Sequence, residues 1–321
     1  MSKTILITGG AGFIGSELVR QISCLKDRVI VIDKLTYSGD LARLKSVKNK
    51  ITFYKLDITD NKRLRALFDK VRPDYVIHCA AETHVDRSIT DNTPFIKTNI
   101  MGTQNLIDAS REFKVKKFLH VSTDEVYGEH ACGYFKETDQ VQPRNPYAVT
   151  KAAGDLLVQA AVKTYGFPAM IVRPCNCYGS WQYPEKLIPV VISKILSGQK
   201  APVYGQGKQI REWLYVEDCA RGIQKIFQKG IIGGIYNIGS GFEQPNIKTV
   251  LAILKLLGKN KDSVAFVKDR PGHDFRYSVD FNCLKFLGWK PLISFEDGLR
   301  RTVAWYIQNQ KWVKQKNKIR R

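Results

Sequence analysis

The feature that most restricts the fold of this chain is a group of regularly spaced glycines behind a short apolar stretch. Gly9, Gly12 and Gly15 form the pattern G-x-x-G-x-x-G directly after Thr4–Thr8, and a stretch with the apolar period of a helix follows. Glycine permits a tight turn and a close approach of a pyrophosphate to the backbone, while the start of a helix offers N–H donors to that anion. The pattern predicts a strand, a phosphate-binding loop and a helix; a glycine turn without a ligand is the alternative.

An acidic residue, Asp33, ends the next apolar stretch. A carboxylate at the end of the second strand can bind a ribose 2′-hydroxyl and repels a 2′-phosphate. The sequence therefore favours NAD over NADP as the dinucleotide, although the neighbouring Lys34 weakens this preference.

Short apolar stretches alternate with amphipathic ones through the first half of the chain. The expected buried strands are Thr4–Thr8, 29–33, 52–55, 75–79, 118–122 and 169–172. Strands that alternate with helices form a parallel sheet covered on both faces. The predicted fold class is therefore α/β, a Rossmann-type doubly wound parallel sheet.

The regularity weakens after Arg173, where prolines and glycines interrupt the pattern and shorter helices are expected over 247–257 and Phe295–Gln308. We expect a smaller C-terminal α/β region that binds substrate and is partly interleaved with the first. The predicted division is 1–173 for the dinucleotide-binding domain, 174–310 for the second region, and 311–321 for a basic tail without fixed structure.

The chain is strongly basic, with 51 Lys and Arg residues against 30 Asp and Glu residues and a formal net charge of +21. The basic residues are spread along the sequence and are not interleaved with stacking aromatic residues. A solvated basic surface is therefore expected rather than a nucleic-acid site, and it can help to attract an anionic substrate.

Other sequence features favour a cytoplasmic enzyme without a metal. The apolar stretches are too short to cross a bilayer, and the start of the chain lacks the long apolar run of a signal peptide. The seven cysteines include no CxxC pair, so reduced thiols are expected rather than a metal site.

Tyr147 and Lys151 form a Y-x-x-x-K pair at the start of a predicted helix, where a four-residue step places both side chains on one face. A nearby ammonium favours tyrosinate, so Lys151 is expected to lower the pKa of Tyr147 and let the phenol act as a base. An ordinary exposed helix face is the alternative.

Thr123, Asp124 and Glu125 follow the predicted strand 118–122. Ligand sites in doubly wound sheets lie beyond the carboxyl ends of the strands, and two adjacent carboxyl groups there suit acid–base chemistry. A helix N-cap or a turn is the alternative.

These motifs together resemble those of the extended short-chain dehydrogenase/reductase family, and within it the nucleotide-sugar 4,6-dehydratases that act on dTDP-glucose. The adjacent acids of Thr-Asp-Glu distinguish such dehydratases from the sugar epimerases of the family. The resemblance extends from Ile5 to about Tyr306, through 33–37, 80–88, 122–128, 173–179, 184–189, 211–218 and 269–274.

The resemblance implies the reaction and the role of each catalytic residue. dTDP-glucose or UDP-glucose is oxidised at C4, loses water across C5 and C6 and regains hydride at C6, which gives a 4-keto-6-deoxy sugar. Tyr147 takes the proton of the C4 hydroxyl, to which Thr123 hydrogen-bonds. Glu125 removes the C5 proton and protonated Asp124 protonates the leaving C6 hydroxyl, while Lys151 completes the set. NAD is regenerated in each turnover, so it is expected to be tightly bound.

The same resemblance implies two sets of binding residues and a homodimer. The dimer is expected through helices near 93–114 and 147–165, and Arg211 and Arg270 are the expected partners of the substrate pyrophosphate. The cofactor set is Gly9, Gly12, Phe13, Ile14, Gly15, Asp33, Lys34, Leu35, Thr36, Asp57, Ile58, Ala80, Ala81, Tyr147 and Lys151. The substrate set is His84, Thr123, Asn176, Lys186, Leu187, Pro202, Tyr204, Arg211, Asn246, Arg270 and His273.

Two alternatives stay open from the sequence. An epimerase or decarboxylase of the same family would share the fold and NAD. A non-catalytic NAD- or RNA-binding protein on this fold is more distant, and the intact set of five catalytic residues argues against it. Both dTDP and UDP substrates fit, because a single methyl group separates the two bases.

Overall fold

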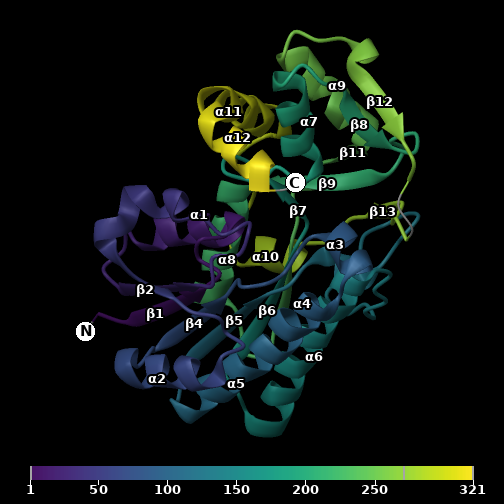
Figure 1. Cartoon of the computed structure of the whole chain (residues 1–321). Coiled ribbons are helices and arrows are strands. Elements are labelled where there is room, and N and C mark those ends of the chain that lie inside the picture. Colours follow the sequence, from purple (N-terminus) through teal and green to yellow (C-terminus); the bar gives the residue numbers. More distant parts are fainter. Residues whose placement is uncertain (1, 270–271, 320–321) are drawn as a thin grey trace.

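The computed structural model describes residues 2–269 and 272–319, which form two lobes (Figure 1). Among the described helices, none combines the length and the apolar character needed to cross a lipid bilayer.

The larger lobe is built on a parallel sheet that has seven strands within the described residues, in the order β10, β6, β5, β4, β1, β2, β3. From β1 to β3 the chain adds strands toward one edge of the sheet, and from β4 onward it adds them toward the other edge. The topological switch point therefore lies between β1 and β4. The strands are β1 Thr4–Thr8, β2 Arg28–Asp33, β3 Ile51–Lys55, β4 Tyr75–His78, β5 Lys117–Val121, β6 Ala169–Pro174 and β10 Ile235–Ile238. The six predicted strands all lie in this sheet, while β10 was not predicted.

Helices cover both faces of the sheet. Leu18 of α1 (Phe13–Ile22) and Ile223 of α8 (Val216–Lys229) are buried in the apolar core on one face. Phe68, Leu106 and Val158 are buried in the core on the other, where they belong to α2 (Asn61–Val71), α5 (Gly102–Glu112) and α6 (Pro146–Tyr165). The predicted doubly wound α/β fold is therefore confirmed.

Shorter helical segments connect these layers. They are η1 Leu41–Lys50, α3 Val85–Thr90, α4 Thr93–Phe95, the π-helix η2 Ile96–Met101, η3 Asp124–Tyr127 and α10 Asn282–Phe286. Since α8, β10 and α10 all follow residue 173, the second half of the chain returns to the large sheet after it has entered the smaller lobe.

The smaller lobe has its own apolar core, in which Ile192, Trp213, Val250 and Leu299 are buried together. Its strands are β7 Asn176–Tyr178, β8 Ala201–Tyr204, β9 Ile210–Tyr215, β11 Glu243–Pro245, β12 Val264–Val267 and β13 Arg276–Tyr277. Its helices are α7 Leu187–Leu196, α9 Asn246–Leu256, η4 Lys261–Ser263, α11 Phe295–Gln308 and α12 Gln310–Ile319. The helix predicted over Phe295–Gln308 has the same bounds as α11. The helix predicted over 247–257 begins and ends one residue earlier, as α9.

The expectation that the basic C-terminal segment has no fixed structure was wrong for its described part. The segment forms α12, in which Trp312 and Val313 are buried. Their partners are aromatic residues far away in the sequence, since the Trp312 ring lies 5.4 Å from Trp181 and 5.3 Å from Trp305, measured between centroids. Because lysines occupy many other positions of this helix, the sequence alone does not reveal its apolar contact.

A buried ion pair joins α6 and β6 inside the larger lobe. Arg173 Nε donates to Asp155 Oδ2 at 2.8 Å, and both side chains are almost fully buried. Removal of one partner from such a pair leaves an uncompensated charge in an apolar surrounding.

Arg173→Met is expected to lower the free energy of unfolding by about 3–5 kcal/mol, because the Asp155 carboxylate then stays buried without its cation. The matched control is Arg300→Met, which removes the cation of the exposed pair with Asp297 and should cost less than about 1 kcal/mol. Urea denaturation measures both. Equal losses in the two variants would contradict a structural role for the buried pair.

Candidate active site

The loop between β1 and α1 can be formed only with glycine at two of its positions. Gly9 has a φ of +65°, and a Cβ on it would lie 2.6 Å from the backbone of Ala80. A Cβ on Gly15 would lie 2.2 Å from the carbonyl oxygen of Gly9. At the N-terminus of α1, no described side chain caps the free N–H groups, which therefore stay available to an anion.

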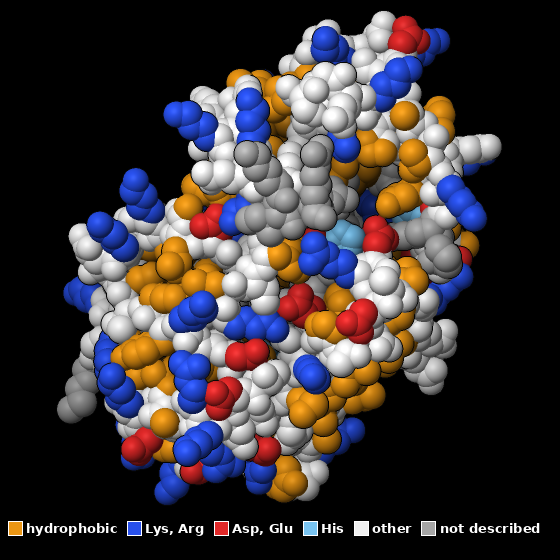
Figure 2. All heavy atoms as spheres, in the orientation of Figure 1, with side chains coloured by type: hydrophobic (Ala, Val, Ile, Leu, Met, Phe, Trp, Pro, Cys, Tyr) orange, Lys and Arg blue, Asp and Glu red, His pale blue; other side chains and the backbone are white. Residues whose placement is uncertain are grey.

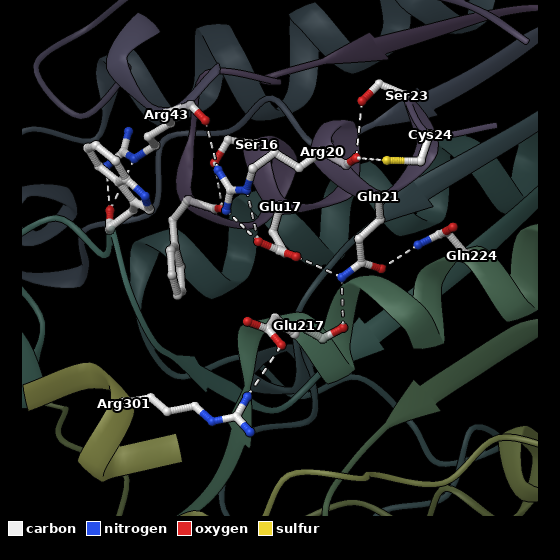
Figure 3. Close-up of polar contacts among 12 residues, drawn as sticks. Ser16, Glu17, Arg20, Gln21, Ser23, Cys24, Arg43, Glu217, Gln224 and Arg301 are labelled. Atoms are coloured by element: carbon white, nitrogen blue, oxygen red, sulfur yellow. Dashed lines mark hydrogen bonds and ion pairs between the residues drawn. The ribbon is translucent and has the colours of Figure 1, made fainter. Parts of the chain in front are cut away.

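Contacts from both sides hold α1 in place (Figure 3). Arg20 donates to the carbonyl oxygen of Arg43 in η1 at 2.8 Å. Gln21 donates to the carbonyl oxygen of Glu217 at 3.2 Å and accepts a hydrogen bond from Gln224. The helix that presents the phosphate-binding N–H groups is thus fixed to both η1 and α8.

Asp33 shapes the loop that follows β2. Its carboxylate accepts hydrogen bonds from the backbone N–H groups of Ala11 at 3.0 Å and Leu35 at 2.8 Å. Burial raises the pKa of Asp33, and these bonds oppose the rise. The neighbouring Lys34 points its ammonium to Thr98 at 2.9 Å and Glu82 at 3.3 Å. The carboxylate that the sequence assigned to a ribose therefore already accepts hydrogen bonds from two loops, the one between β1 and α1 and the one after β2.

A cavity of about 440 Å³ opens beside this loop, between the two lobes. Beyond the predicted residues, its wall includes Arg43, Glu82, Glu185 and Tyr277. The predicted site residues on the wall are Gly9, Gly12, Phe13, Ile14, Gly15, Asp33, Lys34, Thr36, Ile58, Ala80, Ala81, His84, Thr123, Asp124, Glu125, Tyr147, Asn176, Lys186, Leu187, Pro202, Tyr204, Arg211, Asn246 and His273.

Four predicted site residues are not placed on that wall. Leu35 packs against the apolar core, and Asp57 accepts a hydrogen bond from the N–H of Thr59 at 2.9 Å. Lys151 lies behind the wall. Arg270 lies outside the described residues.

The cavity fits a dinucleotide and a second polar ligand. Its wall includes the glycine cradle at the start of α1, where no described side chain caps the helix. The same wall includes Asn176 and Asn246, whose Oδ1 atoms are buried without a hydrogen-bond partner among the described residues. Because buried polar atoms are normally paired, these two oxygens fit a ligand that carries donors.

The two acids lie on η3, directly after β5. Thr123 caps η3, and its Oγ1 accepts a hydrogen bond from the N–H of Glu125 at 3.3 Å and donates to Asp124 Oδ1 at 3.2 Å. Asp124 is 1% exposed. Burial, followed by the negative charges of Glu125 and Glu212, raises the pKa of Asp124 well above its usual range. Burial therefore favours the protonated form of Asp124 next to a second carboxyl group.

Asn145 joins Glu125 to the helix that carries Tyr147, and sequence reasoning missed this residue. Its Oδ1 accepts the N–H of Ala148 at 2.9 Å and so caps α6, while its Nδ2 donates to Glu125 Oε2 at 3.1 Å. The cap is visible in the sequence as Asn before Pro146. The bond to Glu125 is not visible there, because it depends on the tertiary fold.

Tyr147 lies against the acid pair, and the expectation that Lys151 lowers its pKa was wrong. Burial and then the charge of Glu125 raise the pKa of Tyr147 well above its usual value, and the hydrogen bond with Thr123 only partly opposes them. The Lys151 ammonium is buried and donates to the carbonyl oxygen of Val121 at 2.7 Å. Burial lowers the pKa of Lys151 to about 8.

The wall from the smaller lobe carries basic and aromatic side chains. Arg211 donates to the backbone oxygens of Ile210 at 2.7 Å and Asp274 at 2.8 Å, and its guanidinium carbon lies 4.3 Å from the centre of the Tyr277 ring. These contacts fix Arg211 at the cavity. Lys186 reaches across to the other lobe, where its Nζ donates to the Thr83 carbonyl oxygen at 2.8 Å.

Comparison with known proteins agrees with this geometry. Residues 5–239 match the NAD dependent epimerase/dehydratase family. The dTDP-glucose 4,6-dehydratase of Neisseria meningitidis is 45% identical over 97% of this chain and 95% of its own length.

Two solved structures place the chain more closely within that family. A dTDP-glucose 4,6-dehydratase of Streptomyces venezuelae, solved with NAD bound, superposes with a TM-score of 0.95 at 43% identity over 98% of this chain and 99% of its own. The UDP-glucose 4-epimerase of Thermotoga maritima is less similar, with a TM-score of 0.90 and 30% identity over 96% of this chain and 99% of its own. The chain therefore belongs to the NAD-dependent epimerase/dehydratase family, and within it to the dTDP-glucose 4,6-dehydratases.

Proposed function

We propose that this protein removes water from dTDP-glucose and converts its sugar to the 4-keto-6-deoxy form, as an NAD-dependent hydro-lyase. The observation that carries the proposal is the buried pair Asp124 and Glu125 beside Tyr147, on the wall of the cavity. An epimerase needs no acid and base for the loss of water, so the pair favours dehydration. The relatives named dTDP-glucose 4,6-dehydratases support the choice of substrate.

NAD is proposed to lie along the glycine cradle and α1, with Asp33, Lys34, Thr36, Ile58, Ala80 and Ala81 around it. When bound, it supplies a hydride acceptor for C4, a hydride donor for C6 and a positive charge in the site. Such a charge would oppose burial and the charge of Glu125, which raise the pKa of Tyr147 and favour its neutral form. Tyr147 can then take the proton of the C4 hydroxyl, while Thr123 hydrogen-bonds the same oxygen.

The elimination step is assigned to the acid pair. A ketone at C4 acidifies the C5 proton, and Glu125 is proposed to remove it as a base held by Asn145. Asp124 is proposed to give its proton to the C6 hydroxyl, which leaves as water. When C6 regains hydride, C5 regains a proton, and this completes the 4-keto-6-deoxy sugar. When two neighbouring carboxyl groups lie in different environments, one can act as an acid while the other acts as a base.

The substrate diphosphate is proposed to bind near Arg211, with Lys186, Asn246 and His273 on the same wall. Arg211 has five N–H donors, and its backbone bonds leave some of them for a phosphate oxygen. Arg270 is proposed as a second cation by resemblance. Asn176 has an unpaired buried oxygen that suits a sugar hydroxyl.

We also propose a cytoplasmic homodimer that does not act on nucleic acid. Exposed apolar side chains on η2 and α6, among them Ile96, Met101, Val149 and Leu156, suit a dimer interface. Figure 2 shows Lys and Arg side chains scattered over both lobes of one face rather than gathered into one patch. The proposed functional division remains 1–173 for cofactor, 174–310 for substrate and 311–321 as a basic segment.

The direct test is turnover on dTDP-glucose and UDP-glucose side by side, with products identified by NMR. The proposal expects a 4-keto-6-deoxy sugar from dTDP-glucose without an added oxidant. A 4-epimer that retains its C6 hydroxyl would instead assign the protein to the epimerases.

The acid and base roles should separate by substitution. Glu125→Gln is expected to stop the release of the C5 proton, because the amide cannot accept it. Asp124→Asn is expected to let the C4 ketone form while its sugar keeps the C6 hydroxyl, because no proton reaches the leaving group. Loss of label from C5-deuterated substrate and mass analysis of the sugar measure the two steps. Near-normal turnover in either variant would contradict the assignment.

Asp124 is expected to stay protonated at neutral pH. A raised pKa means that the carboxyl group keeps its proton at pH values where an exposed aspartate is ionised. Infrared difference spectra of the wild type and Asp124→Asn at pH 7 should show the carbonyl stretch of a protonated acid in the wild type. A difference spectrum that shows only a carboxylate band would refute the protonated state.

Asn145→Ser should slow the release of the C5 proton by about tenfold while C4 oxidation changes little, since a hydrogen bond to a charged group contributes about 1.5–3 kcal/mol. Serine still caps α6, so the unfolding temperature should change little. Asn145→Asp is the matched control: it keeps the cap but faces Glu125 with a carboxylate, and should be at least as slow. Wild-type rates of proton release in both variants would exclude a positioning role.

A further inference from the structure

The loop between β2 and η1 forms part of the cavity wall without belonging to a helix or a strand. Lys34, Thr36, Ser38 and Gly39 from this loop line the cavity, next to Asp33 at the end of β2. Because the segment lacks the hydrogen bonds of a regular element, its position depends on contacts made by side chains and by its ends.

Hydrogen bonds of Asp40 and Arg43 fix the far end of this loop. The N–H of Asp40 donates to the carbonyl oxygen of Ala11 at 3.0 Å. Asp40 Oδ1 accepts the N–H of Ala42 at 2.9 Å and so caps η1. The buried guanidinium of Arg43 donates to the carbonyl oxygens of Ala11, Ser38 and Trp181.

The remaining oxygen of Asp40 is held by α12, which lies more than 270 residues later in the chain. Trp312 Nε1 donates to Asp40 Oδ2 at 2.7 Å, and Lys316 Nζ lies 2.8 Å from the same oxygen. Burial alone would raise the pKa of Asp40, but the hydrogen bond from Lys316, with those from Ala42 and Trp312, lowers it below its usual value.

α12 also reaches the wall that comes from the smaller lobe. The carbonyl oxygen of Lys316 accepts a hydrogen bond from the hydroxyl of Tyr183 at 3.2 Å, and Tyr183 lines the cavity. The ring of Trp312 lies 5.6 Å from the guanidinium carbon of Arg43. A single helix thus contacts the loop, η1 and the substrate side of the cavity.

We infer that Asp40, Trp312 and Lys316 are positioning residues with which α12 clamps the 34–40 loop over the bound dinucleotide and slows its release. The inference rests on the proposed function, in which NAD occupies the cavity through successive turnovers. A cofactor that must be reused in each cycle benefits from slow release. The clamp fixes the far end of the loop, in addition to the hydrogen bond at 3.2 Å that Tyr37 in its middle donates to Glu185.

The test measures the release of NAD and does not depend on turnover. Protein loaded with isotopically labelled NAD is mixed with excess unlabelled NAD, and the label that stays bound is followed by rapid filtration. Trp312→Phe keeps an aromatic ring but loses the N–H donor. Lys316→Met keeps most of the length of the side chain but loses its charge, and Asp40→Asn can still cap η1. Lys314→Met is the matched control, since Lys314 lies on the exposed side of the same helix.

The clamp predicts that Trp312→Phe combined with Lys316→Met releases NAD about tenfold faster than the wild type, since two hydrogen bonds to Asp40 are lost. Lys314→Met should match the wild type. Because Lys316 and Asp40 act as one pair, Asp40→Asn should add little to the effect of Lys316→Met. Wild-type release from the Trp312/Lys316 double variant, or full additivity of Asp40→Asn and Lys316→Met, would overturn the clamp. Failure of the wild type to bind NAD would instead count against the proposed function.

Discussion

The parallel direction of the central sheet is the constraint on which the rest of the structure depends. All of its strands end at the same edge, so the loops after β1, β2, β4, β5 and β6 meet there. This places the glycine loop, Asp33, Ala80, the acid pair and Asn176 around one cavity, although they are spread over more than 160 residues. The smaller lobe adds the opposite wall, and the chain returns from it to complete the sheet with β10.

Burial then gives the edge of the sheet its chemistry. Asp124, Tyr147 and Lys151 are all withdrawn from water, and for each of them burial is the largest cause of its pKa shift. In each case the neutral form is favoured, as expected for ionisable groups moved into an apolar surrounding. A cationic group placed beside Tyr147 would act against this burial and favour the ionised form of its phenol.

The parts of the molecule that the sequence predicts are those with a local cause. Strands and helices follow from apolar periods, the loop after β1 from glycine spacing, and the place of Thr123, Asp124 and Glu125 from their position after a strand. The similarity to dTDP-glucose 4,6-dehydratases confirms the dehydratase prediction made from these motifs. What the sequence does not predict are contacts between distant side chains, such as Asn145 with Glu125 or Trp312 with Asp40. For the same reason, the four-residue step from Tyr147 to Lys151 does not reveal that the ammonium is bound to the Val121 carbonyl.

The central claim is that oxidation at C4 and reduction at C6 occur on one sugar within one enzyme cycle. The most direct measurement uses dTDP-glucose with deuterium at C4 and locates the label in the product by NMR. The account predicts a 4-keto-6-deoxy sugar that carries the deuterium at C6. Deuterium that remains at C4, or that leaves the sugar in stoichiometric amount with a released cofactor, would contradict it.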